Sequence, residues 1–327
     1  MQLRKIFSHL LCFSALVAVN TAIELDTARA DTRYVSKLGA DSPTCGSTNA
    51  AACLTITTAL ANAVTAGGYV RVILTSNGAF QEAITITTPT ELRTSGDVVA
   101  LIAPPAGQVA ITVNAGVNDY IRMSDMYLGG NSGAAAEGIR FNSGASLEIH
   151  NTQIRGFGGP GLNFKPSGGT MAHLLIDRSE IADGTTQCVM VVPSGMQANA
   201  VVTNSLIHNC GTLGLRADSQ SLTAGSFVKT FLANTRIFSV GASAVSAFSG
   251  AGGGNARVSV DDGQLVNAAT GAVANGPAAS VVLNRTTVSG TSTALNGTGG
   301  GLIYSYGNNA INFNASPGSA PTPVAPQ

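Results

Sequence analysis

The sequence predicts an all-β solenoid, in which short parallel strands coil around one long and narrow core. The first observation is a six-residue pattern with apolar ends that recurs past residue 110 at a drifting interval of about 27 residues. Its clear copies are Ile149–Ile154, Ile176–Ile181, Val202–Ile207, Leu232–Ile237, Val260–Leu265 and Leu283–Val288, with a poorer copy at Ile121–Met126. A repeat of this length buries its apolar side only by stacking on its neighbours.

The second observation is a small residue followed by an aliphatic residue after each clear copy. The aliphatic residue falls eight positions beyond the copy five times and seven positions once. These pairs are Gly161-Leu162, Cys188-Val189, Gly214-Leu215, Ala244-Val245, Ala272-Val273 and Ala294-Leu295. We expect the small residues to form one column where two walls of the solenoid come close together.

The kind of repeat follows by exclusion. No stretch keeps an apolar period of 3.6 residues, which excludes helical repeats, and the spacing of leucine-rich repeats is absent. A left-handed β-helix needs strict hexapeptides, which the drifting period forbids. A right-handed parallel β-helix remains. At ~25 residues and ~4.8 Å per coil, residues 69–311 predict nine or ten coils and a rod of roughly 45 Å.

The third position of the pattern predicts a corner between two strands. It is occupied by Asn151, Arg178, Asn204, Asn234, Asp262 and Arg285. Asn and Asp tolerate the left-handed backbone conformation that a tight bend requires. The Ser or Thr that follows in most copies leads into the next strand.

The N-terminus has the features of a signal peptide. Arg4 and Lys5 precede a mostly apolar run, and Ala28-Arg29-Ala30 has the small residues that a signal peptidase recognises. A membrane anchor is disfavoured, because the run contains polar residues and is marginal in length. Later segments lack the ~18 apolar residues of a membrane span. We therefore expect residues 1–30 to be removed and the protein to be periplasmic, cell-surface or extracellular.

Four cysteines remain after cleavage, an even number that allows two disulfides in an exported chain. Cys45 and Cys53 flank a polar loop with little apolar area of its own, so we expect them to pair. Cys188 falls in the small-residue column, and Cys210 lies four residues short of the equivalent place on the next coil. An extended path would separate their Cα atoms by more than ~7 Å, which disfavours this pair unless a turn intervenes.

The segment before the repeats adds a family resemblance. Ile56, Leu60, Ala63 and Val64 lie on one helical face before a Gly-Gly stop, and two short strands separated by Gly78-Ala79-Phe80 follow. This order resembles the N-terminal cap of pectate-lyase-like right-handed β-helix proteins, and the Cys45/Cys53 loop resembles that of their short exported bacterial members. The resemblance covers about residues 33 to 311. It implies the fold but no single activity, because the superfamily includes lyases, glycosidases, epimerases and proteins without known chemistry.

The expected organisation is a signal peptide (1–30), an N-terminal loop and capping helix (31–68), the β-helix (69–311) and a disordered Pro/Ala tail (312–327). Four Pro lie between Ala315 and Gln327, which is typical of a disordered segment. We expect a monomer.

Composition narrows the function. Lys+Arg and Asp+Glu are 17 each, and only 10% of residues are charged, so nucleic acid is a disfavoured partner. The histidines do not fall at metal-ligand spacing with Cys or carboxylates, and we expect no metal or cofactor. Trp is absent, which leaves Tyr127 and Phe157, beside Gly-rich turns, as the candidates for sugar stacking, with simple packing the stronger alternative for both.

One surface patch combines acids with possible bases. Asp177, Glu180 and Asp183 share a coil, with Arg155 and His208 in one column two coils apart. The register adds the neighbouring pairs His150–Asp177, Gln153–Glu180 and Asn209–Asp183. Such a patch can hold catalytic groups, since glycosidases use two carboxylates. Solvated charges that prevent aggregation of the coil faces are the stronger alternative.

Two functions follow from these observations. We favour an exported, non-catalytic β-helix that binds or is displayed at an extracellular or cell-envelope glycan, because its charges are thinly spread. The alternative is a polysaccharide lyase or glycoside hydrolase that uses the Asp177/Glu180/Asp183 face, and only the lyase would require Ca²⁺. A groove on which Asp177, Glu180 and Arg155 converge would favour the enzyme. A flat face with Arg178 paired to the acids would rule the enzyme out.

Overall fold

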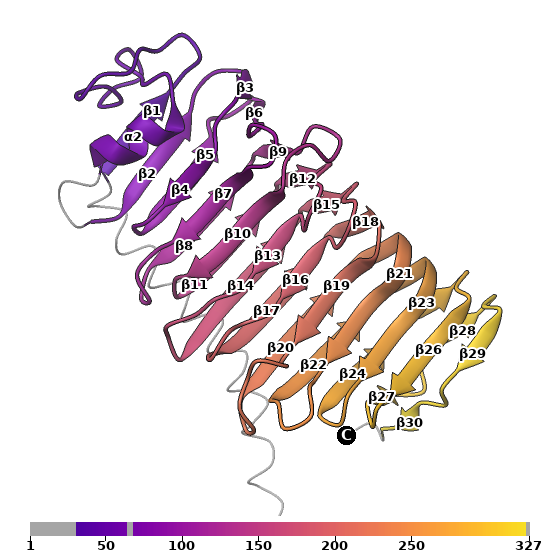
Figure 1. The fold of residues 1–327 in the computed structure, drawn as a ribbon. Helices are drawn as coiled ribbons and strands as arrows, with labels where there is room; N and C mark the ends of the chain where they lie inside the picture. The colour runs from indigo at the N-terminus through magenta and orange to yellow at the C-terminus, as the bar shows by residue number, and fades with distance from the viewer. Residues whose placement is uncertain (1–30, 64–67, 325–327) are drawn as a thin grey trace, which may run out of the picture.

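The computed structural model describes residues 31–63 and 68–324. The described chain is a rod of stacked coils, with parallel strands running side by side from one end to the other (Figure 1). The predicted parallel β-helix is confirmed. The signal-peptide prediction and Val64 of the expected capping helix lie outside the described residues. The described part contains no helix with the length and hydrophobicity of a membrane span.

Each coil contributes one strand to each of three walls, which we call walls 1, 2 and 3. Wall 1 is a 12-stranded sheet. Its strands are β1 (Asp31–Val35), β2 (Val70–Leu74), β5 (Thr90–Thr94), β8 (Tyr120–Ser124), β11 (Ser146–His150), β14 (Met171–Asp177), β17 (Gln197–Thr203), β20 (Phe227–Ala233), β22 (Asn255–Asp261), β24 (Ala279–Asn284), β27 (Leu302–Ser305) and β30 (Thr322–Pro323). Without the terminal β1 and β30, ten coils remain, as predicted.

Walls 2 and 3 belong to one 18-stranded sheet that turns a corner. Wall 2 contains β3 (Gly78–Phe80), β6 (Ala100–Ile102), β9 (Tyr127–Gly129), β12 (Gln153–Arg155), β15 (Glu180–Ala182), β18 (Leu206–Cys210), β25 (Thr287–Ser289) and β28 (Ala310–Asn312). Wall 3 contains β4 (Ile84–Ile86), β7 (Val109–Asn114), β10 (Glu137–Ser143), β13 (Leu162–Phe164), β16 (Val189–Val191), β19 (Leu213–Asp218), β26 (Thr293–Thr298) and β29 (Ser316–Gly318). The long strands β21 (Arg236–Phe248) and β23 (Gln264–Asn275) run through both walls.

The repeat is in register along the stack. The first residues of the six clear copies pair with one another across wall 1, and their last residues do the same across wall 2. These apolar columns are buried and form the long core. The prediction of stacked coils from the spacing is therefore confirmed.

Two details of the register were predicted wrongly. The early copy starts at Met123, which pairs with Ile149, and not at Ile121. Asp125 is then the corner residue, with a φ of 59°. Ala272, and not Val273, pairs with Val245. The segment that leads from wall 2 to Ala272 is therefore one residue shorter than predicted. Gly271 takes the small-residue position, where an added methyl group would lie 2.7 Å from a backbone oxygen of the next coil.

The predicted corner is confirmed in every clear copy. The third residues of the pattern all have φ between 45° and 52°, in the left-handed region. The Ser or Thr that follows is buried and donates a hydrogen bond to the carbonyl two residues earlier, as Ser179 does to Asp177 at 2.9 Å. Thr152, Ser205, Thr235 and Thr286 repeat this contact. The same carbonyl also accepts the backbone N–H of the corner residue on the preceding coil, so the hydroxyl adds a second hydrogen bond that holds the bend.

A second left-handed column was not anticipated. It lies two residues beyond the inward side chain of wall 2, where the chain leaves for wall 3. Its non-glycine members include Asp183, Asn209, Ser239 and Asn267, with φ between 52° and 56°. Asp183 therefore has a corner position of its own, independent of any chemical role.

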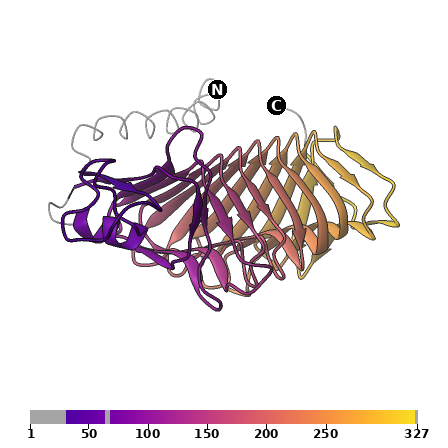
Figure 2. The same ribbon diagram turned by 90° about the horizontal axis from the view of Figure 1, so that it is seen from above.

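The N-terminal cap closes one end of the rod (Figure 2). Helix α2 (Ile56–Ala63) buries Ile56, Ala59, Leu60 and Ala63 against the first coil. The Glu82 carboxylate of that coil accepts hydrogen bonds from the backbone N–H groups of Ile56 and Thr57, which satisfies two free donors of the helix N-terminus. The expected boundary at residue 69 is wrong for β1, which pairs with β2 and belongs to the stack.

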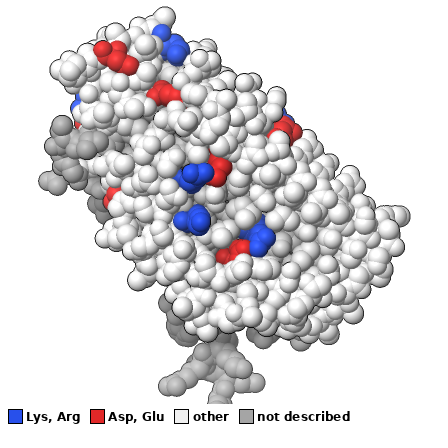
Figure 3. All heavy atoms as spheres, viewed as in Figure 1, with Lys and Arg blue, Asp and Glu red and all other residues white. Residues whose placement is uncertain are grey.

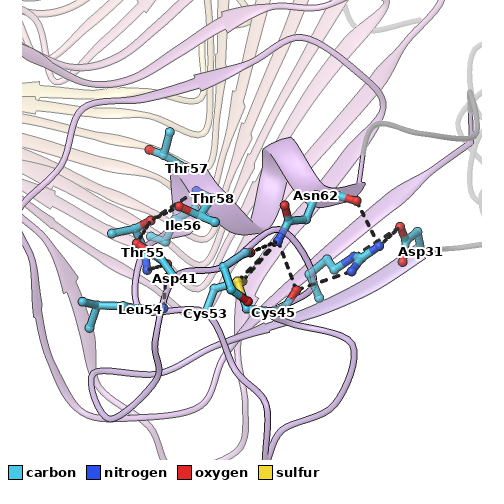
Figure 4. The surroundings of a disulfide bond; sticks show 12 residues. Asp31, Asp41, Cys45, Cys53, Leu54, Thr55, Ile56, Thr57, Thr58 and Asn62 are labelled. Atoms are coloured by element: carbon cyan, nitrogen blue, oxygen red, sulfur yellow. Dashed lines mark hydrogen bonds and ion pairs between the residues drawn. A yellow bond between two sulfur atoms is a disulfide. The ribbon is translucent and has the colours of Figure 1, made fainter.

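The loop before α2 is held by the predicted disulfide. Cys45 and Cys53 are bonded, with their Cα atoms 5.0 Å apart (Figure 4). Asp41 accepts hydrogen bonds from the backbone of Leu54 and Thr55 at the start of the helix. Asn62, near the helix end, donates to the Cys45 carbonyl at 3.2 Å. The loop and the helix therefore form one unit.

The chain end differs from the predicted disordered tail (312–327). Residues 316–318 and 322–323 form β29 and β30, which pair with β26 and β27. The Asn314 side chain also accepts hydrogen bonds from the backbone and hydroxyl of Thr291. Main-chain pairing needs no apolar side chain, so a composition rich in Pro and Ala did not exclude a last coil. Residues 325–327 lie outside the described part.

Candidate functional site

The segments that join wall 2 to wall 3 decide where a groove forms. In the four coils that follow the first, residues 103–108, 130–136, 156–161 and 183–188 lie outside the strands at this corner. Farther along the rod, only residues 211–212 separate β18 from β19, and β21 and β23 cross the corner without interruption. The non-strand segments border a groove of about 1010 Å³ beside wall 2. It is lined by Ala79, Gln81, Leu101, Ala103–Ala106, Tyr127, Gly129–Ser132, Arg155, Gly156, Asp183 and Thr185.

The floor of the groove is apolar and depends on one glycine. A methyl group added at Gly129 would lie 2.9 Å from Leu101 Cδ1 and 3.7 Å from Tyr127 Cε1. The side chains of Leu101 and Tyr127 therefore occupy the space that a side chain at position 129 would need. Tyr127 is half-buried and lines the groove. Phe157, the other aromatic candidate, is buried in the core, in agreement with the packing alternative.

One rim of the groove has a strained backbone. Asn131, Ser132 and Gly133 are consecutive and all have positive φ, at 51°, 55° and 92°. The Gly133 N–H donates to the Gly156 carbonyl at 2.6 Å, which ties this rim to the next coil. Non-glycine residues in this region cost of order 1 kcal/mol each and occur often at ligand sites.

The predicted patch forms an ion-pair cluster at one end of the groove. Arg155 Nη2 lies 3.4 Å from Glu180 Oε1, and Arg155 Nε lies 3.1 Å from Asp183 Oδ2. His208 Nε2 is 2.7 Å from Glu180 Oε1, and Asn209 donates to Asp183 at 3.0 Å. The register agrees with the sequence prediction, because Arg155 and His208 flank Ala182 on either side.

Only two members of this cluster line the groove, namely Arg155 and Asp183. His208 lies outside the lining, stacked on Phe238 with ring centroids 4.7 Å apart. Its Nε2 contacts Glu180, and its Nδ1 is buried without a partner among the described residues. His208 therefore holds Glu180 in place and is not presented to a ligand.

Asp177 does not join the cluster, contrary to the expectation of one carboxylate group. It lies on wall 1, and the corner at Arg178 separates it from Glu180 on wall 2. Arg178 Nε is 2.9 Å from Asp177 Oδ2, and Thr203 and Asn204 donate to Oδ1. Burial acts to raise the pKa of Asp177, but these hydrogen bonds and Arg178 together bring the pKa below its ordinary value.

The arrangement is suited to sugar hydroxyls. Arg155 supplies N–H donors and Asp183 supplies carboxylate acceptors at the polar end, whereas Leu101, Tyr127 and the prolines at 104 and 105 supply apolar surface. Charge is otherwise scarce: on the face shown in Figure 3, acids and bases are few and most of the surface is uncharged.

Among the described residues, one group of side chains has metal-ligand spacing, namely Asp41, Cys45 and Cys53. Both sulfurs form the disulfide, and Asp41 accepts hydrogen bonds at the start of α2. Its ligand atoms are therefore already used.

Solved structures provide the comparison with known proteins. An alginate lyase from Paenibacillus sp. str. FPU-7 aligns with a TM-score of 0.56 and 13% identity, over 89% of this chain and 98% of its own. The A-module of a mannuronan C-5 epimerase from Azotobacter vinelandii has a TM-score of 0.50 and 15% identity, over 83% and 95%. A lacto-N-biosidase from Eubacterium ramulus has 0.51 and 8%, over 94% and 70%. These structures resemble this chain in fold. No family model and no curated protein matches the sequence.

In this β-helix a second disulfide lies behind the ion-pair cluster. Cys188 and Cys210 are bonded, with Cα atoms 5.5 Å apart, so the prediction against this pair was wrong. That prediction assumed an extended path, but β18 ends at Cys210 and a turn at residues 211–212 precedes β19. Both side chains consequently point into the core. Cys210 lies two residues beyond His208, and the bond fixes this end of β18 to the preceding coil.

Proposed function

We propose that the protein is an exported β-helix that binds a polysaccharide chain in the groove beside Tyr127. The observation that carries this proposal is the groove itself, which is open, apolar along its floor and polar at one end. It crosses the coils from β3 to β15, four strand spacings or about 19 Å, which suits an extended chain of several sugars. Export is supported by the signal-peptide pattern and the two disulfides.

The choice of a sugar ligand rests on the mixture of surfaces. Carbohydrate sites combine an aromatic face for the apolar side of a ring with paired donors and acceptors for its hydroxyls. Tyr127 provides the first, and Arg155 with Asp183 provides the second. The alginate lyase and the mannuronan epimerase that share this fold are named for polysaccharides, which is compatible with the proposal.

Binding in the groove predicts a selective effect at Tyr127. Tyr127→Ala is expected to weaken polysaccharide binding about tenfold, or 1.4 kcal/mol, because a stacked ring loses its aromatic partner. Affinity electrophoresis against a panel of neutral and acidic polysaccharides, followed by calorimetry on the best ligand, measures this change.

Tyr120→Ala is the matched control, because Tyr120 is 47% exposed on wall 1 of the same coil. It is expected to leave the affinity unchanged. Equal losses in the two variants would place the ligand elsewhere, and failure of the whole panel to bind would end the proposal.

A second candidate function is cleavage of the bound chain by a lyase or glycoside hydrolase. One observation favours it: a carboxylate, a cation and a phenol line the same groove, at Asp183, Arg155 and Tyr127. The sequence pattern had placed Asp177 in this site, but Asp177 lies on another wall. Ca²⁺ would be needed only for a lyase that holds an acidic sugar through metal.

Cleavage of the bound chain would give products that distinguish it from binding alone. Unsaturated ends absorb in the ultraviolet and new reducing ends are titratable, so either product can be measured directly. Asp183→Asn is expected to lower such activity by about 100-fold or more, the scale of one general acid or base, while binding persists. Asn tolerates the left-handed backbone at this corner. Asp177→Asn is the control and should retain activity. If no product forms from any bound polysaccharide, the protein only binds.

A further inference from the structure

A second surface with binding chemistry lies on wall 1, away from the groove. Three side chains of β20 point outward, namely Phe227, Lys229 and Phe231. The next strand, β22, places Arg257 directly beside Lys229. We call these four residues the basic–aromatic face. None of them lines the groove, so the inference does not depend on the proposed function.

The positive charge of this face is uncompensated. Like charges directly opposite on neighbouring strands repel each other and destabilise a sheet. Neither Lys229 nor Arg257 forms an ion pair with any carboxylate in the described ranges. The nearest acid on β22 is Asp261, which is held by Arg285 at 2.7 Å. Both cations are exposed and are therefore free to contact an anion from outside the chain.

The same wall neutralises its charges elsewhere. In the first coils, the column that contains Phe231 carries alternating charges at Arg71, Glu91, Arg122 and Glu148. Arg71 pairs with Glu91 at 2.6 Å, and Arg122 pairs with Glu148 at 3.1 Å. The contrast shows that the solenoid can accommodate carboxylates beside cations on this wall. Their absence beside Lys229 and Arg257 is a local property of the basic–aromatic face.

The apolar part of the face continues along the rod. In the register of wall 1, the column of Phe231 contains Leu175 and Val201 on the preceding coils and Ser259, Val282 and Tyr304 on the following ones, so Ser259 is its one polar member in this stretch. Phe231 is 41% exposed, and Lys229 Nζ lies 4.0 Å from the centroid of the Phe227 ring. A ligand would therefore meet cations on one side and an apolar strip on the other, both running parallel to the rod axis.

We propose that the basic–aromatic face binds an anionic polysaccharide that lies along the rod. Acid groups on neighbouring sugars would contact Lys229 and Arg257, and a ring would stack on Phe231. The strand spacing of about 4.8 Å is close to the length of one sugar ring along such a chain. An anionic membrane is a poorer fit, because lipid-binding segments carry clusters of about four to eight cations. Nucleic acid is also disfavoured by the low number of cations.

The test measures binding to polygalacturonate at several salt concentrations. Lys229→Ser/Arg257→Ser is expected to weaken binding at least tenfold at low salt and to remove most of the salt dependence. Phe231→Ala is expected to weaken binding severalfold and to leave the salt dependence unchanged. Lys165→Ser, which removes a cation beside wall 3, is the matched control for Lys229→Ser and should bind like the unmodified protein.

Three results would overturn the inference. Equal effects of Lys165→Ser and Lys229→Ser would mean that only overall charge matters. Stronger binding to oligothymidylate than to polygalacturonate, lost in the double variant, would reassign the face to single-stranded nucleic acid. Loss of polygalacturonate binding in Tyr127→Ala, with binding retained in Lys229→Ser/Arg257→Ser, would place the polymer in the groove.

Discussion

Replacing Phe164 with alanine is expected to lower the free energy of unfolding by about 3–5 kcal/mol. Phe164 is fully buried on β13 and stacks on Phe141 of the preceding coil, with ring centroids 4.7 Å apart. Its removal leaves a cavity in a core that is only one coil wide, so few neighbours can move to fill it. Equilibrium unfolding in urea measures the total loss.

The position of the damage is a second readout of the same variant. Each coil of a solenoid contacts only its neighbours, so hydrogen exchange should accelerate first in the strands on either side of β13. Phe231→Ala is the matched control, because it deletes the same side chain from the surface and should cost less than about 1 kcal/mol. Similar losses in the two variants would contradict the packing described for Phe164.

Removing the Cys188–Cys210 disulfide is expected to cost about 3.4 kcal/mol on the loop-entropy scale. The bond joins two cysteines with a sequence separation of 22 and fixes the end of β18. Cys188→Ala/Cys210→Ala should therefore also loosen Asn209, whose side chain donates to Asp183 at the groove. Urea unfolding gives the global change, and hydrogen exchange at the Asn209 amide gives the local one.

The Cys45–Cys53 disulfide provides the comparison. It closes a shorter loop, with a sequence separation of 8. On the same scale it should contribute about 2.6 kcal/mol. It lies in the cap, so Cys45→Ala/Cys53→Ala should leave exchange at Asn209 unchanged. Faster exchange there in both variants would mean that the cap and the groove unfold together.

The fold was predictable because its columns repeat. An apolar residue that must face the core in every coil fixes the spacing, and Asn or Asp at the corner marks the bend. Positions with weaker constraints were misplaced. Met123 was passed over for Ile121, because both are apolar and only the corner at Asp125 distinguishes them. The turn at residues 211–212 was also missed, and with it the bond between Cys188 and Cys210.

The candidate site was predictable only in part. Arg155 and His208 were placed correctly in one column, because strand register follows from the repeat. Asp177 was grouped with Glu180 by proximity in sequence, but the left-handed corner at Arg178 sends their side chains to different walls. The groove was not foreseen, because its shape comes from linking segments of several coils. The available signal was the interval from Leu128 on wall 2 to Ile139 on wall 3, which is eleven residues where most clear copies have eight.

The ends of the rod determine how far the sheets can grow. Pro317 and Pro323 lie in the last strands, β29 and β30, and proline has no N–H to donate to a further strand. At the opposite end, α2 packs on the first coil. Parallel sheets with two bare edges are templates for fibre growth, and this chain blocks one edge with a helix and interrupts the other with proline. Individual rods are therefore expected to stay separate at high concentration and not to join end to end into filaments.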